Sequence, residues 1–95
     1  GQVGVDEVGK STALPVSILG RATSGHVVLG FTAEAAGTAT VRIFDLTGRE
    51  VYRQAVQAIT GANRTTLMPA GLAAGAYILR VDAAGKAGVV KFGIE

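Results

Sequence analysis

Cysteine and tryptophan are both absent from this chain of 95 residues, and proline occurs only twice. The lack of cysteine excludes disulfides and thiolate-bound metals, but it leaves the compartment open, because an oxidising environment does not require disulfides. No apolar stretch approaches the roughly 20 residues of a membrane-spanning helix. Residues 1–10 also lack the basic and apolar segments of a signal peptide. Because the first residue is not Met, we expect a piece of a larger protein, whose export signal lies elsewhere.

Positive charge is in slight excess, with a net charge of +2, but the nine basic residues form no run. Proteins that bind nucleic acid usually gather Lys and Arg on one face and interleave aromatic residues that stack on bases. Nucleic acid is therefore not an expected partner. Sixteen of the apolar residues are alanine, so a core must come mainly from the Val, Leu, Ile and Phe side chains.

Alternation of apolar and polar residues is the main pattern from residue 12 onward, clearest in segments 27–32 and 77–82. About seven such segments, separated by turn residues, are typical of an antiparallel β-sandwich of the immunoglobulin type. No segment has the helical period over roughly ten residues. We therefore predict an all-β, immunoglobulin-like domain over residues 12–95, preceded by a flexible linker or an edge strand over residues 1–11.

Two strands have an expected place in the sheets. Pro15 has no N–H to donate, so the strand that it opens should lie at an edge. The last segment, residues 86–95, is a second candidate for an exposed edge, to which a partner strand could pair.

A tight hairpin is the strongest local signal. Two alternating runs flank residues 45–48, where Gly48 can adopt the positive φ that a hairpin turn needs and the Asp45 carboxylate can accept hydrogen bonds from backbone amides. A second phrase, Gly75-Ala76-Tyr77, opens a later strand. Tyr77 alternates with apolar residues, so we expect its ring to be buried and its hydroxyl to find a backbone partner.

In order and spacing these phrases resemble the type A C-terminal sorting domain of the bacterial type IX secretion system. In that family a strand ends in an Asp-x-x-Gly turn, a loop closes in Gly-x-Tyr, and a last hairpin carries a Lys near the chain end. The resemblance covers roughly residues 18–95, and it departs at Arg21 and Ala22, where the family usually has Asn-Pro. The matching residues are Asp45, Gly48, Gly75, Tyr77, Lys86 and Lys91.

The resemblance implies a module that sorts a larger secreted protein to the bacterial cell surface and attaches it there. The implied partners are the outer-membrane secretion machinery, a sortase-like enzyme that cuts on the N-terminal side, and N-terminal cargo domains such as a hydrolase or an adhesin. Recognition would depend strongly on the last strand, with Lys86 and Lys91. Immunoglobulin-like modules of multidomain hydrolases share the same phrases, so a structural or carbohydrate-binding module remains the alternative.

No set of residues points to catalysis, a metal or a cofactor. The single histidine, His26, has no nucleophile or second ligand near it in the sequence, so a solvated strand end accounts for it. The seven carboxylates fall in predicted turns, strand ends or termini, without the density of a calcium loop. The segment from Gly20 to Gly25 lacks the Gly-Lys-Ser/Thr ending of a phosphate-binding loop. We therefore expect neither enzyme activity nor a cofactor.

Phe44 and Tyr52 are the remaining candidates for binding. They belong to the two arms of the predicted hairpin and can pair across its outer face. Such a pair would be a small platform for a carbohydrate or ordinary cross-strand packing, and packing is the favoured interpretation.

Overall fold

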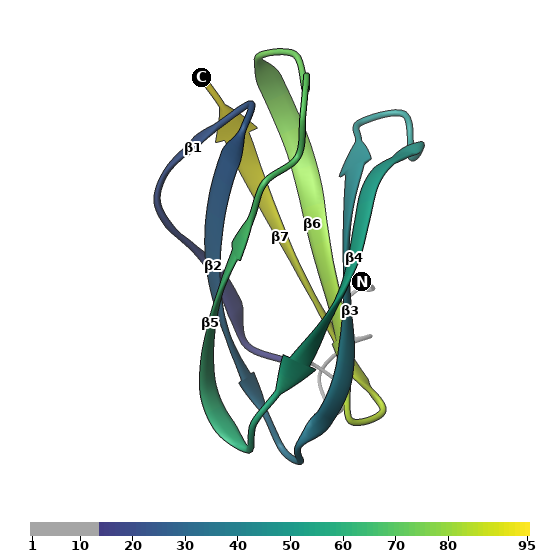
Figure 1. Cartoon of the computed structure of the whole chain (residues 1–95). Coiled ribbons are helices and arrows are strands. Elements are labelled where there is room, and N and C mark those ends of the chain that lie inside the picture. Colours follow the sequence, from purple (N-terminus) through teal and green to yellow (C-terminus); the bar gives the residue numbers. More distant parts are fainter. Residues whose placement is uncertain (1–13) are drawn as a thin grey trace.

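The computed structural model describes residues 14–95, which form seven strands (Figure 1). No helix that could cross a membrane occurs in this part of the chain. The linker or edge strand expected over residues 1–11 lies outside the described residues, so the domain boundary stays a prediction. The strands are β1 (Val16–Thr23), β2 (His26–Ala33), β3 (Gly37–Asp45), β4 (Glu50–Ala58), β5 (Gly61–Leu67), β6 (Gly75–Ala83) and β7 (Lys86–Ile94).

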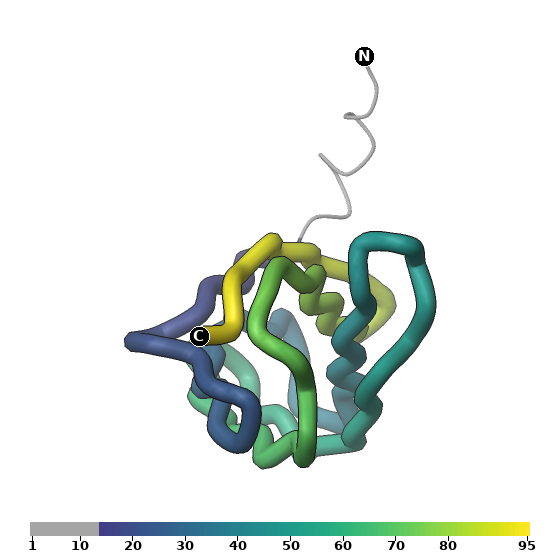
Figure 2. Tube along the Cα trace, turned by 90° about the horizontal axis from the view of Figure 1, so that it is seen from above, coloured from purple at the N-terminus to yellow at the C-terminus, as the bar shows by residue number. Residues whose placement is uncertain are grey.

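The strands follow the order β4-β3-β6-β7-β1-β2-β5 and fold into two layers. β4, β3, β6 and β7 pair antiparallel in one layer, while β1, β2 and β5 pair antiparallel in the other. Seen along the strands, the chain surrounds a common interior (Figure 2). The prediction of an all-β domain of about seven strands is confirmed, and the arrangement is consistent with an immunoglobulin-like sandwich.

The core lies between the layers and is built by period-two alternation. Leu29 of β2, Ile43 of β3 and Leu79 of β6 are fully buried, and the inward sets predicted for segments 27–32 and 77–82 are confirmed. Burying one such side chain stabilises the fold by about 1.5 to 3 kcal/mol. The outward side chains of the same strands form the surface of each layer.

β1 joins the two layers. From Val16 to Leu19 it pairs with β2. The edge position that Pro15 predicts is wrong for the strand as a whole, because β1 lies between β7 and β2 in the strand order. The register then shifts around Gly20, which has a φ of 73°. Beyond this irregularity, Ala22 of β1 pairs with Ile94 of β7 in parallel orientation. This parallel pair departs from the purely antiparallel sandwich predicted. Positive φ is open to glycine because it has no Cβ.

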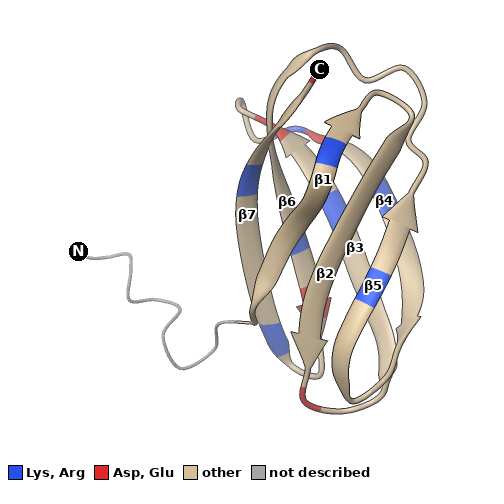
Figure 3. Ribbon diagram, turned by 90° about the vertical axis from the view of Figure 1, so that its left-hand side faces the viewer, with Lys and Arg blue, Asp and Glu red and all other residues tan. Residues whose placement is uncertain are grey.

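The last strand lies inside the sheet, and the expectation of an exposed edge there is wrong. β7 pairs with β6 from Lys86 to Ile94 and meets β1 at its end (Figure 3). The Leu14 N–H also donates to the carbonyl of Ala87, at 3.0 Å. The physical reason is that β1 crosses from one layer to the other, which brings Ala22 against the end of β7, while Leu14 bonds near its start.

Candidate functional site

The Asp45 carboxylate organises the turn between β3 and β4. Its Oδ1 accepts hydrogen bonds from the Thr47 N–H at 2.9 Å, the Thr47 hydroxyl at 2.6 Å and the Arg49 N–H at 3.1 Å. Gly48 donates its N–H to the Asp45 carbonyl at 3.0 Å and has a φ of 92°. The Asp-x-x-Gly phrase therefore forms the hairpin turn that the sequence predicts.

These bonds hold the pKa of Asp45 below its ordinary value. The hydroxyl of Thr47 has the largest effect, followed by the backbone N–H of Arg49. The Arg49 guanidinium, whose Nε lies 3.2 Å from Oδ2, adds a smaller attraction. Each donor favours the charged form, so the turn is best formed while Asp45 is ionised.

The Gly-x-Tyr phrase closes the loop that leads into β6. Gly75 has a φ of 145°, which admits glycine far more readily than other residues. Two residues on, the buried Tyr77 donates its hydroxyl to the carbonyl of Ala73 at 2.6 Å. Its ring lies against Phe92 of β7, with 6.1 Å between the ring centroids. The predicted burial of Tyr77 and its backbone partner are confirmed.

Both phrases come together at one end of the sandwich. Asp45 of β3 lies directly opposite Tyr77 of β6, and Gly75 lies opposite Ile94 of β7. Figure 1 shows the β3–β4 turn, the loop into β6 and the end of β7 at this same end. The four motif residues thus support two neighbouring loops through backbone and ring contacts, and their part in a recognition signal stays a prediction.

The two lysines of the expected signal differ in their surroundings. Lys86 begins β7 at the other end of the sandwich, where its Nζ lies 2.9 Å from Oε2 of Glu34. Lys91 is exposed on β7, opposite Ile78 of β6. Within residues 14–95 it makes no ion pair. The structure does not bring the two lysines together.

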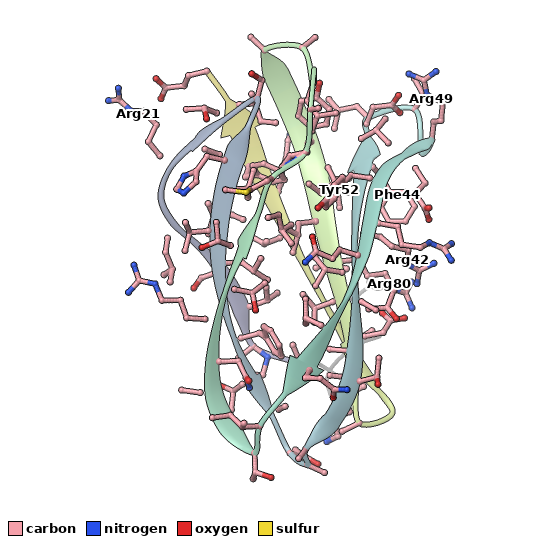
Figure 4. All side chains as sticks on the ribbon, in the orientation of Figure 1. Arg21, Arg42, Phe44, Arg49, Tyr52 and Arg80 are labelled. Carbon is pink, nitrogen blue, oxygen red and sulfur yellow. The ribbon has the colours of Figure 1, made fainter. Side chains whose placement is uncertain are left out.

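Phe44 and Tyr52 lie on opposite faces of their sheet, so they form neither a platform nor a cross-strand pair. Tyr52 is opposite the buried Ile43 and packs partly against the core. Phe44 follows Ile43 on β3 and points outward, beside Arg42 (Figure 4). The reason is a register shift in the β3–β4 pair, which places Glu50 opposite Phe44 and moves Tyr52 to the inner face.

The remaining titratable residues form no metal or catalytic cluster in the described part of the chain. No group of three His, Cys, Asp or Glu residues is close enough there to hold a metal ion. His26 is exposed at the start of β2. Every carboxylate within residues 14–95 is instead paired with a Lys or Arg; they are Glu34, Asp45, Glu50, Asp82 and Glu95.

A row of three arginines crosses the outer face of the four-stranded layer, and sequence reasoning missed it. Arg42 of β3 lies directly opposite both Arg53 of β4 and Arg80 of β6. Asp82 accepts hydrogen bonds from Arg42 at 3.0 Å and from Arg80 at 2.7 Å. Glu50 receives two bonds from Arg53, which lower the pKa of Glu50. The residues lie far apart in sequence, so only the strand register reveals the row.

Comparison with solved structures adds little about function. A β-glucosidase from Listeria innocua, in complex with isofagomine, is similar over 86% of this chain and 15% of that chain. The identity is 17% and the TM-score 0.40. This chain therefore spans a small part of that enzyme, and so weak a likeness carries no argument. None of the curated proteins matches this sequence.

A family model gives the decisive finding. The secretion system C-terminal sorting domain matches residues 23–95, which include β2 to β7. This family carries the sorting signal of type IX secretion, which implies secretion to the cell surface and contact with the secretion machinery. It also implies attachment to a larger cargo protein, and the family is not an enzymatic one. The chain belongs to the family of secretion system C-terminal sorting domains.

Proposed function

We propose that the outer-membrane machinery of type IX secretion reads this domain as a folded unit. A sortase-like enzyme then cuts on its N-terminal side and leaves the cargo at the cell surface. The domain is a signal in this scheme and not a catalyst, and the cargo is a hydrolase or an adhesin. The observation that carries the proposal is the family match over β2 to β7.

The position of β7 supports recognition of the folded domain. Its Phe92 and Ile94 side chains are core residues, and its backbone pairs with β6 along its whole length. A partner could not bind this segment as an extended tail without first breaking the sandwich. The signal is therefore a surface that the folded strands present.

Lys91 is the candidate contact within that surface, and Lys86 is a structural residue. Lys91 is exposed and makes no ion pair within residues 14–95, so its ammonium group is available to a partner. Lys86 already donates a hydrogen bond to Glu34, and this contact links the start of β7 to the β2–β3 connection. Lys91→Ala should therefore reduce export without lowering stability, whereas Lys86→Ala should cost at most about 1 kcal/mol of stability and leave export intact.

The test is an export assay in a bacterium that has type IX secretion. The whole chain is fused to the C-terminus of a fluorescent reporter that carries its own inner-membrane export signal. A matched fusion without the domain serves as the control, and protease accessibility on whole cells reports surface exposure. Surface fluorescence that depends on the domain is the expected result.

Retention of a folded fusion in the periplasm would overturn the proposal. Folding is checked by proteolysis of the periplasmic extract, so that an unfolded fusion is not mistaken for a signal that is not read. A carbohydrate-binding module would then be tested by retardation on insoluble polysaccharides, although the opposed faces of Phe44 and Tyr52 give it no structural support.

Cleavage is tested on the same fusion by mass. If a sortase-like enzyme acts, the surface form of the reporter loses most of the 9.6 kDa of the domain. An intact fusion at the surface would retain the sorting proposal and exclude cleavage.

A further inference from the structure

The arginine row, consisting of Arg42, Arg53 and Arg80, places like charges directly opposite one another. Neighbouring strands lie about 4.8 Å apart, so the three guanidinium groups follow each other across three strands. Like charges that face each other across a strand pair destabilise a sheet. Nothing in the core requires arginine here, because all three side chains project from the outer face.

The neighbouring carboxylates offset this charge only in part. Asp82 accepts hydrogen bonds from both Arg42 and Arg80, and Glu50 accepts them from Arg53. Two carboxylates therefore face three guanidinium groups. The Nε of Arg42 is buried and has no hydrogen-bond partner within residues 14–95, so it adds no donor to the surface. The row thus keeps a net positive charge of one guanidinium group.

Apolar side chains border the row on the same face. The Arg42 guanidinium carbon lies 5.8 Å from the centre of the Phe44 ring, and Ile78 is directly opposite Phe44. Val89 of β7 is opposite Arg80 and is 60% exposed. Figure 4 shows Arg42, Phe44 and Arg80 projecting together from this side of the molecule, away from Tyr52. Aromatic residues and arginine together are typical of protein interfaces.

We infer that the outer face of β4, β3, β6 and β7 docks an acidic segment of a protein partner, whose carboxylates pair with Arg42, Arg53 and Arg80. The planar guanidinium group matches a carboxylate in a bidentate geometry. The apolar residues beside the row contact the rest of the segment. This inference rests on the surface itself and not on the proposed function.

The two carboxylates within the arginine row make a protein segment a better ligand than a dense anionic surface. Glu50 and Asp82 lie within the row and would be repelled by closely spaced phosphates of a membrane or a polyphosphate. A peptide can place a few carboxylates against the guanidinium groups and keep them away from Glu50 and Asp82. Membranes, by contrast, attract clusters of four or more unopposed Lys and Arg residues.

Binding is tested with a short fluorescein-labelled peptide in which glutamate alternates with valine, followed by fluorescence anisotropy. A peptide with glutamine in place of glutamate is the control ligand. The whole chain is compared with the double variant Arg42→Gln, Arg80→Gln. A second double variant, Arg21→Gln, Arg64→Gln, removes the same charge from exposed positions on β1 and β5.

The expected result is that the glutamate peptide binds the whole chain, more weakly at high salt, and that the glutamine peptide does not. Loss of Arg42 and Arg80 should weaken binding about tenfold, whereas loss of Arg21 and Arg64 should change it less than about twofold. Circular dichroism confirms that both variants are folded.

Three outcomes would overturn the inference. The first is absence of binding by the glutamate peptide at low salt. The second is an equal loss of affinity in both double variants, which would mean that only net charge matters. The third is arginine-dependent binding to polyphosphate or to phosphatidylglycerol vesicles without binding to the peptide, which would assign the face to a phosphate surface.

Discussion

At the scale of single residues, the family motifs act through local hydrogen bonds. The Oδ1 atom of Asp45 accepts three hydrogen bonds that close one turn, and the Tyr77 hydroxyl closes the neighbouring loop. Their recurrence in such a motif follows from loop geometry, because an Asx turn needs a carboxylate or amide and a buried phenol needs an acceptor.

Asp45 makes the stability of the turn dependent on pH. Its folded-state pKa lies below the ordinary value of 3.8, so its contribution is present above that pH and is lost as the pH falls through the folded-state pKa. Asp45→Asn should lower Tm by a few degrees at pH 7, and the difference from the parent should shrink toward pH 3. Calorimetry across this pH range measures the Tm of both proteins. A Tm difference that stays constant with pH would contradict the role of the Asp45 charge.

Tyr77→Phe tests the loop closure alone. The ring keeps its packing on Phe92, but the carbonyl of Ala73 loses its partner. We expect a loss of about 1 kcal/mol in the free energy of unfolding, measured by urea denaturation. Tyr52→Phe is the matched control, since within residues 14–95 its hydroxyl bonds only to the side chain of Gln54, and it should cost less.

At the scale of elements, β7 is the strand on which the two layers depend. It pairs with β6 on one side and with β1 on the other. Its glycines differ in the space that a side chain would find. A Cβ at Gly88 would overlap the carbonyl oxygen of Leu14, where the chain crosses the strand. A Cβ at Gly93 would be 3.9 Å from the nearest backbone atom, which is ordinary contact.

The pair Gly88→Ala and Gly93→Ala therefore tests the crossing. Gly88→Ala should lower the free energy of unfolding by about 1 to 3 kcal/mol, because the backbone at Leu14 must shift. Gly93→Ala should change it by less than about 0.5 kcal/mol. Equal effects in chemical denaturation would show that the Leu14 contact is not tight.

At the scale of the whole molecule, removing residues 86–95 should unfold the domain. The loss of buried Phe92 and Ile94 alone costs about 3 to 6 kcal/mol, at about 1.5 to 3 kcal/mol for each, out of a total stability of about 5 to 15 kcal/mol for a domain. Circular dichroism should show an unfolded chain. A truncated domain that keeps a cooperative thermal transition would mean that the remaining strands suffice.

This expectation decides how the sorting signal can be mapped. A failure of the truncated chain to reach the surface would reflect unfolding as much as a lost contact. Single substitutions of exposed residues, such as Lys91→Ala, separate the two causes because they leave the core in place.

The sequence by itself determined the class of fold, most strands and the family motifs. The alternation of apolar and polar residues indicates which side chains point inward, so the burial of Tyr77 was predictable. The residues of a turn are close in sequence, so the hairpin at residues 45–48 was predictable too. The resemblance carried by these motifs agrees with the family match.

Only the tertiary structure decided which strands are neighbours and which surfaces they make. It placed β7 inside the sheet, moved Tyr52 to the inner face through one register shift, and aligned Arg42, Arg53 and Arg80. These features depend on pairing between distant segments. Because a shift of one residue in register turns a side chain to the other face, no local pattern could have supplied them.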